Sequence, residues 1–302
     1  MRSIPMSRRG FTILELLVAL VLLGLVSTAI YRVLVNNQRL YMAQTQRIDL
    51  SQNIRAANTI LSAEFRELDA FDGDITAMGP DSLVIRGMRW LSFVCVPPAL
   101  AGNNLGNQMI IRGRAVGDPM FFGSRYINET NDSLLIYLDG NQTTRLDDYY
   151  VAARLAATPG NQQCPAVGAV PAMPGTRIVF DGNFIPGTNV AGAITVGAPV
   201  RGFERVKYRI YQPSGDTSWY IGFQPAGQTI QPLIGPVLSN GLTFQYFNAA
   251  GVATAVRTQV ARIDVTVRAR TTAQVRTGGS APSRAIVDSI TFSVALRNNR
   301  RF

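Results

Sequence analysis

The feature that most constrains this chain is an apolar segment near its N-terminus that contains one acidic residue. Residues 11–30 form a stretch of 20 positions in which Glu15 is the only charged side chain. At about 1.5 Å per residue, a helix over this stretch spans about 30 Å, enough to cross the hydrocarbon core of a bilayer. Placing a carboxylate at that depth in a bilayer costs free energy, and such a residue usually interacts with a partner group. We therefore take Glu15 as a candidate functional residue.

The charges that flank this segment predict its orientation. Arg2, Arg8 and Arg9 precede it and no acidic residue does, which places the short N-terminal side in the cytoplasm and exports the rest of the chain. A cleaved secretory signal peptide would end in small residues after the apolar run. Residues 31–50 show no such exit, so we expect a single-pass membrane anchor.

The helical pattern continues beyond the membrane segment. Between Leu25 and Asp72 the chain contains neither glycine nor proline. Apolar residues recur at helical spacing, on one face of a helix, at Leu50, Ile54, Ala57, Leu61, Phe65 and Leu68. We predict one helix from about residue 11 to residue 68, with a membrane-spanning segment over 11–35 and an amphipathic segment over 36–70.

The N-terminal sequence RRGFTILELLVALVLLGLV resembles the class III signal of type IV pilins and type II secretion pseudopilins. In that signal a short basic leader ends in glycine and is followed by an aromatic residue, a threonine, two aliphatic residues and a glutamate. Here the leader is 1–10, ending at Gly10, and Phe11, Thr12 and Glu15 occupy the other marked positions.

The resemblance implies a processing route and a role for Glu15. A prepilin peptidase would cleave between Gly10 and Phe11 and methylate the Phe11 amine, which keeps its positive charge. Glu15 would then pair with the Phe11 ammonium of a neighbouring subunit. The implied partners are other pilins or pseudopilins of the same filament, prepilin peptidase, the inner membrane and the assembly platform. The C-terminal domain would be periplasmic before the subunit enters a filament at the cell surface.

Residues 71–302 read as a β-rich exported domain. DSLVIRGMRW and SLLIYLDGN are typical of strands bounded by turns, and RVKYRIYQ and SWYIGFQ flank a PSGD turn and predict a hairpin. VARIDVTVRAR and SITFSVALR alternate apolar and polar residues, which indicates antiparallel sheet with one wet face. The apolar faces would cover the amphipathic helix, giving an α+β fold that resembles the pilin fold.

Two segments, PPALAGNNLGNQ and ATPGNQQCPAVGAVPAMPG, read as long loops and lie beside the two cysteines, Cys95 and Cys164. Export to an oxidising compartment favours one disulfide between them; the alternative is one buried and one exposed thiol. The acidic segments 69–74 and 138–148 do not fit the spacing of a calcium loop. We expect no metal ion and no cofactor.

The residue inventory argues against catalysis. The chain has no histidine and two cysteines, which excludes Ser-His-Asp and Cys-His chemistry and a thiolate metal cage. We expect a protein that is not an enzyme. The net charge is +10, but the arginines are scattered singly, so the sequence does not favour a nucleic-acid surface.

The resulting prediction is a minor pilin or minor pseudopilin, a structural or priming subunit. The chain is long for a repeating subunit, and Arg32 stands where many major pilins carry a helix-weakening proline. Its C-terminal strands are similar to those of the PilW and GspJ-type proteins. The alternative is a pilus-tip adhesin or DNA-uptake subunit. Sequence leaves open whether the filament belongs to a type IV pilus or to type II secretion.

Overall fold

The computed structural model describes residues 12–98, 107–113, 117–139, 143, 149–157, 160–168, 171–181, 194–275 and 282–297. It divides into two compact units. The first comprises Met1–Gln52 and Arg270–Val287, and the second comprises Asn53–Ala269 and Asp288–Phe302. The units therefore divide the long helix between Gln52 and Asn53.

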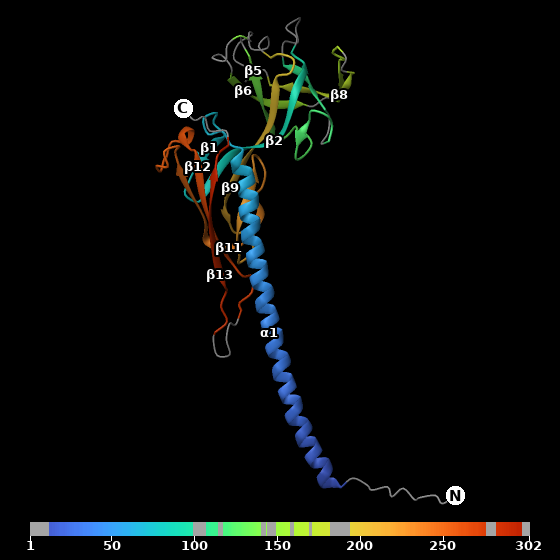
Figure 1. Ribbon diagram of the computed structural model, residues 1–302, viewed down its shortest axis with the longest axis vertical. Helices are drawn as coiled ribbons and strands as arrows, with labels where there is room; N and C mark the ends of the chain where they lie inside the picture. Colours follow the sequence, from blue (N-terminus) through green and yellow to red (C-terminus); the bar gives the residue numbers. More distant parts are fainter. Residues whose placement is uncertain are drawn as a thin grey trace, which may run out of the picture. The chain divides into compact units, whose positions relative to one another are not determined.

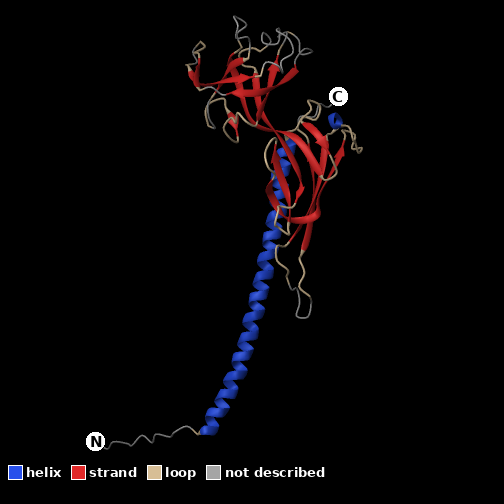
Figure 2. Cartoon of the chain, turned by 180° about the vertical axis from the view of Figure 1, so that it is seen from behind, coloured by secondary structure: helices blue, strands red, loops and turns tan. Residues whose placement is uncertain are grey.

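Helix α1 (Ile13–Arg66) is a single element of 54 residues, drawn in blue in Figure 1. This confirms the predicted uninterrupted helix, with ends that differ from the prediction by two residues each. The predicted apolar face is buried along its whole length, from Leu50 to Leu68. The C-terminal end of the helix is fixed by the Arg297 N–H, which donates to the Arg66 carbonyl at 2.8 Å. Elsewhere the described regular structure is almost entirely strand (Figure 2).

A first antiparallel sheet packs against the C-terminal part of α1, at Asn53 and Phe65. Its strands are β1 (Ile75–Met78), β2 (Ser82–Val96), β9 (Pro199–Tyr211), β10 (Trp219–Pro225), β11 (Gln231–Phe247), β12 (Arg262–Arg270) and β13 (Val287–Ala295), in that spatial order. Phe65 of the helix contacts the rings of Tyr208 and Phe244 edge-on, at centroid distances of 5.5 and 6.0 Å. The Asn53 side chain donates to the Gly235 carbonyl at 3.0 Å. The helix is thus anchored on this sheet by both packing and hydrogen bonding.

The predicted strand patterns agree with this sheet. In β12 the four residues Ile263, Val265, Val267 and Ala269 are fully buried, and the residues between them are half-buried. Strands β9 and β10 form the predicted hairpin. Its PSGD turn is closed by the Asp216 N–H, which donates to the Pro213 carbonyl at 3.1 Å. Gly215 lies there at φ +81°, a conformation that favours glycine.

Strands β2 and β9 extend beyond the first sheet into a closed ring that the sequence did not predict. The added strands are β3 (Gln108–Arg112), β5 (Asp132–Leu138), β6 (Tyr149–Ala157) and β8 (Met173–Phe180). The ring runs β2-β3-β8-β6-β5-β9 and closes because β9 pairs with both β5 and β2. Its interior is a separate apolar core that includes Trp90, Phe121 and Phe180.

Two further short strands pair with strands of the ring. Strand β4 (Phe122–Gly123) pairs with β2, and β7 (Asn161–Cys164) pairs with β8. The segment 157–175 was predicted as a loop, and this prediction is wrong over β7 and the start of β8. Its polar and glycine-rich residues obscure the antiparallel pairing of β7 with β8, which is the one pairing of β7 among the described strands. An edge strand of this kind needs no apolar alternation.

In the first unit, the segment after β12 is tied back on itself and to the helix. The Thr271 N–H donates to the Ile286 carbonyl at 2.9 Å, and the Ile286 N–H donates to Thr271 Oγ1 at 3.0 Å. The Ala273 N–H donates to Gln46 Oε1 at 3.1 Å. The segment after β12 is therefore hydrogen-bonded to α1 at Gln46, one turn before the buried face begins at Leu50.

Candidate assembly site on the N-terminal helix

The N-terminal turn of α1 is closed by a threonine cap. Thr12 precedes the first helical residue, and its Oγ1 accepts the backbone N–H of Glu15 at 3.3 Å. The T-x-x-E spacing is that of a capping box. Glu15 lies in the first turn, where a negative charge complements the helix dipole. The side chain of Glu15 is exposed, so it is available to a group from outside the chain. Gly10 and Phe11 lie outside the described residues.

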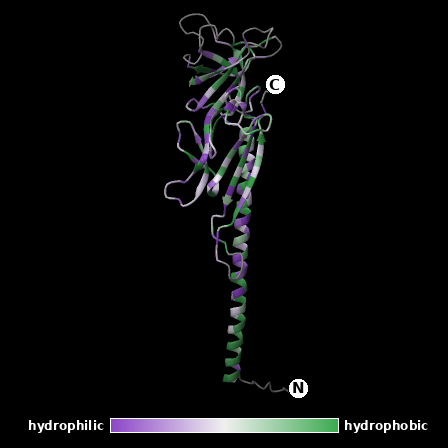
Figure 3. Cartoon of the chain, turned by 90° about the vertical axis from the view of Figure 1, so that its left-hand side faces the viewer, coloured by the Kyte–Doolittle hydropathy of each residue, from purple (hydrophilic) through white to green (hydrophobic). Residues whose placement is uncertain are grey.

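The helix surface that follows Glu15 is apolar and uncovered. Large apolar side chains over 13–34 are 53–81% exposed, and Figure 3 shows this part of α1 coloured mostly as hydrophobic. By length and composition α1 can cross a membrane, and it is the one such helix in the described part of the chain. An apolar surface of this extent needs lipid or apolar helices of other molecules to cover it.

Within this apolar segment Gly24 has no side chain, so the helix surface is recessed at this position. A Cβ built on Gly24 meets nothing within 4 Å. The Gly24 carbonyl oxygen also accepts the Thr28 hydroxyl at 2.8 Å. Helices in membranes approach one another closely at small residues such as these. The helix also continues unbroken through Arg32, the position at which the sequence lacks a proline.

At the other end of α1, a buried ionic network joins the helix to both sheets. Arg89 on β2 lies 3.0 Å from Glu64 of the helix and 3.1 Å from Glu204 of β9. Arg125 lies 3.3 Å from the same Glu204 and hydrogen-bonds Asp132 of β5 at 3.0 Å. The side chains of Arg89, Glu204 and Asp132 are 9%, 7% and 0% exposed. Buried charges of this kind persist only when each one is paired.

Electrostatics and packing both hold this network in place. Burial lowers the pKa of Arg89, but the carboxylates of Glu64 and Glu204 outweigh that effect and raise it overall. The Trp90 indole N–H donates to Asp132 at 3.0 Å. The Trp90 ring lies directly over Gly202, where a Cβ would stand 1.9 Å from it. The helix end, β2, β5 and β9 are therefore held in one fixed arrangement.

Sequence reasoning did not identify any residue of this network. The residues that form its central pair, Arg89 and Glu204, are 115 positions apart, and neither lies in a recognisable motif. A charged residue at the centre of a strand, as Glu204 is in GFERVKYRIY, is a signal that a buried partner exists. It does not say which residue that partner is.

The remaining residues singled out from the sequence lie in the second unit. Cys95 and Cys164 are joined by a disulfide that links β2 to β7. In segment 69–74, Asp74 accepts the Asp69 N–H at 2.8 Å and Asp69 accepts the Phe71 N–H at 3.0 Å. These carboxylates fix the turn after the helix. No cluster of metal-ligating side chains occurs within the described ranges, and most of segment 138–148 lies outside them.

One comparison with known proteins gives a match. Residues 5–31 match the model of the family described as the prokaryotic N-terminal methylation motif. The match covers the second half of the leader with Arg8 and Arg9, Glu15, and the uncovered apolar helix as far as residue 31. No significant match is found among curated proteins or among solved structures.

Proposed function

From the N-terminal methylation motif, which supports a type IV pilin-like protein, we propose that this chain is a minor pilin or minor pseudopilin. The observation that carries the proposal is a coincidence of two features. The motif over 5–31 overlaps the start of a 54-residue helix whose first half is apolar and exposed. Such a helix suits a subunit that is stored in a membrane and then packs among like helices. The motif points to a structural subunit rather than an enzyme.

In this proposal Glu15 is the residue that orients assembly. Cleavage after Gly10 creates a cationic N-terminus at Phe11, and the exposed Glu15 of one subunit accepts the ammonium of another. The pair forms among apolar helices, where an unpaired charge is costly, so correct stacking is favoured over misaligned stacking. Prepilin peptidase, the inner membrane and the assembly platform are the partners that this route requires.

Two observations favour a minor subunit over the repeating one. The chain carries a closed ring of strands in addition to the sheet that covers the helix. A bulky addition of this kind is easier to place at a filament end than in every repeat. Helix α1 also passes through Arg32 without a break.

The orientation that follows from the leader arginines puts the second unit in the periplasm.

The test is processing and incorporation in a host with a prepilin peptidase and a matching filament system. We expect cleavage between Gly10 and Phe11, with one added methyl group seen by mass spectrometry of the purified chain. Glu15→Gln should be cleaved normally, because glutamine preserves the capping-box spacing, yet it should be lost from sheared filaments. The matched control is Asp49→Asn, which removes an exposed acid of the same helix outside the apolar segment.

Two results would count against the proposal. An uncleaved chain in the presence of active peptidase removes the processing step. A Glu15→Gln variant that enters filaments as well as the Asp49→Asn variant removes the charge-pair mechanism.

A further inference from the structure

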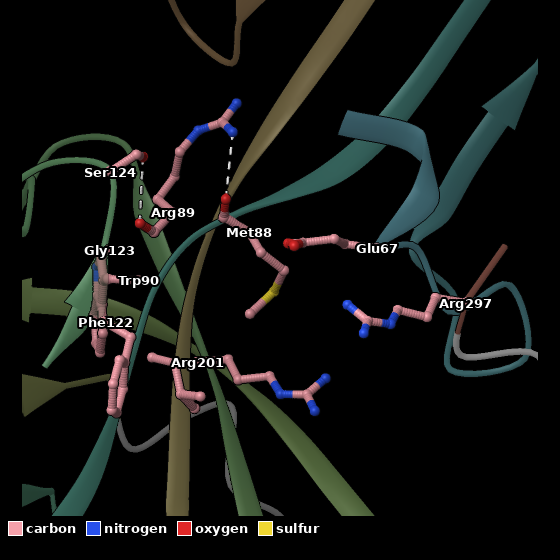
Figure 4. Close-up of a pocket in the computed structure, with 10 residues that line it drawn as sticks. Glu67, Met88, Arg89, Trp90, Phe122, Gly123, Ser124, Arg201 and Arg297 are labelled. Carbon is pink, nitrogen blue, oxygen red and sulfur yellow. Dashed lines mark hydrogen bonds between the residues drawn. The ribbon is translucent and has the colours of Figure 1, made fainter. Parts of the chain in front are cut away.

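A pocket of about 600 Å³ lies in the second unit, where α1 ends and β2 passes from the first sheet into the ring. Figure 4 shows the side chains of Glu67, Met88, Arg201 and Arg297 extending toward a common space from separate elements. Trp90 and Phe122 line its other side. The ionic network described above borders the pocket but does not fill it, because Arg89 is directed to Glu64 and Glu204.

Two of the lining guanidinium groups have no carboxylate partner within the described ranges. Arg201 is half-buried, and its guanidinium lies over the Tyr150 ring at 5.0 Å from the centroid. Arg297 uses its backbone N–H to cap the helix and leaves its side chain exposed. Neither forms one of the ion pairs of the described residues. Guanidinium groups so placed bind carboxylates or phosphates through paired N–H donors.

The wall beside these arginines is apolar and partly exposed. Phe122 is 58% exposed, and Met88 and Leu91 are half-buried in the same pocket. Exposed aromatic residues and methionine next to arginine are the composition of interface hot spots. A ligand for this pocket therefore carries an apolar group beside its anion.

The acidic residue of the lining, Glu67, favours one class of anion over another. Glu67 extends into the pocket opposite the arginines (Figure 4), and its carboxylate repels a doubly charged phosphate more than a singly charged carboxylate. We propose that this pocket binds an acidic side chain, together with a neighbouring apolar side chain, of a peptide segment from a partner protein. Arg201 and Arg297 receive the carboxylate, and Phe122 and Met88 receive the apolar group. The inference does not depend on the proposed function.

The test uses the full chain in detergent micelles and a capped dipeptide, N-acetyl-aspartyl-phenylalanine amide. Binding of the dipeptide is measured by isothermal titration calorimetry at low salt. We expect saturable binding with a Kd on the order of 1 mM. The asparagine analogue of the peptide should bind roughly ten- to a hundredfold more weakly, because it lacks the charge that the arginines receive.

Arg201→Gln and Arg297→Gln should each weaken binding of the aspartyl peptide by a similar factor. The matched control is Arg205→Gln, an exposed arginine of the same strand β9 that does not line the pocket, and it should bind as the unaltered chain does. The peptide comparison needs no variant, so a misfolded variant leaves the test intact.

Three results of the ligand titrations would overturn the proposal. They are equal binding of the aspartyl and asparaginyl peptides, no saturation up to about 10 mM, and inorganic phosphate binding more tightly than the aspartyl peptide. Equal losses in Arg205→Gln and Arg201→Gln would also reject the pocket as the site.

Discussion

Replacing Arg89 by methionine tests whether the buried network stabilises the second unit by pairing charges. Methionine keeps an unbranched, flexible stem and removes the guanidinium. After the change, Arg125, at 3.3 Å, is the one cation that pairs with Glu204 among the described residues. Glu64, whose side chain is 24% exposed, can turn to solvent. The loss therefore falls mainly on the buried carboxylate of Glu204.

The size of the effect follows from this arrangement. Removing one partner of a buried ion pair costs about 3–5 kcal/mol, because it leaves the other charge uncompensated. Since Arg125 still compensates Glu204 in part, we expect about 3 kcal/mol. For a unit of this size, about 2–4 °C of melting temperature corresponds to each kcal/mol, so the melting temperature should fall by about 6–12 °C.

The assay is thermal unfolding of the full chain in detergent micelles, followed by tryptophan fluorescence, because Trp90 contacts the network through Asp132. The matched control is Arg262→Met. Arg262 pairs with Asp264 on the protein surface, with side chains 41% and 18% exposed, and such pairs contribute about 0–1 kcal/mol.

A double variant separates charge from packing. Adding Glu204→Gln to Arg89→Met removes the buried carboxylate that lost its closer partner, so the double variant should be more stable than Arg89→Met alone. The reasoning is refuted if Arg89→Met loses no more stability than Arg262→Met. It is also refuted if the double variant is the less stable of the two.

Gly202→Ala should lower the free energy of unfolding by several kcal/mol, because the new Cβ would stand 1.9 Å from the Trp90 ring and overpacking of a core costs about 1–3 kcal/mol or more; urea unfolding measures it. Replacing both Cys95 and Cys164 by alanine opens a loop with a sequence separation of 69, which should cost about 4 kcal/mol and should match the loss on reduction of the unaltered chain. Burial is the main cause that raises the pKa of Asp74 from 3.8 to about 6. The folded state then binds this proton more tightly than the unfolded state, so Asp74 contributes stability below pH 4 that is lost as pH rises through 6, about 3 kcal/mol in total. Asp74→Asn should flatten this part of the curve of stability against pH, and an unchanged slope between pH 4 and 7 would contradict the assignment.

Local patterns were sufficient for the helix and for much of the first sheet. The 3.6-residue spacing from Leu50 to Leu68 predicted the buried face of α1, and strict alternation predicted the buried residues of β12. The basic leader and Glu15 were found because a charge in an apolar segment is conspicuous. In each case the signal lies within a few turns of helix or one strand.

The ring and the pocket could not be predicted in this way. The ring closes because one stretch of β9 pairs with both β2 and β5, and strand patterns specify which face is buried but not which strand is the neighbour. Arg201 and Arg297 meet in the pocket only because the C-terminal segment returns to the end of α1. Such contacts depend on the whole topology.

The sharing of β2 and β9 between the first sheet and the ring also has a mechanical consequence. Neither strand is interrupted by a linker between the two parts: β2 pairs with β9 from Ser82 to Phe93, with one register shift between Met88 and Trp90. A force that pulls the ring away from the helix is therefore carried along two hydrogen-bonded strands, where many backbone bonds resist together in shear. We expect the ring to behave as a stiff extension of the helix-covering sheet, so that tension applied to it reaches α1 with little loss to bending.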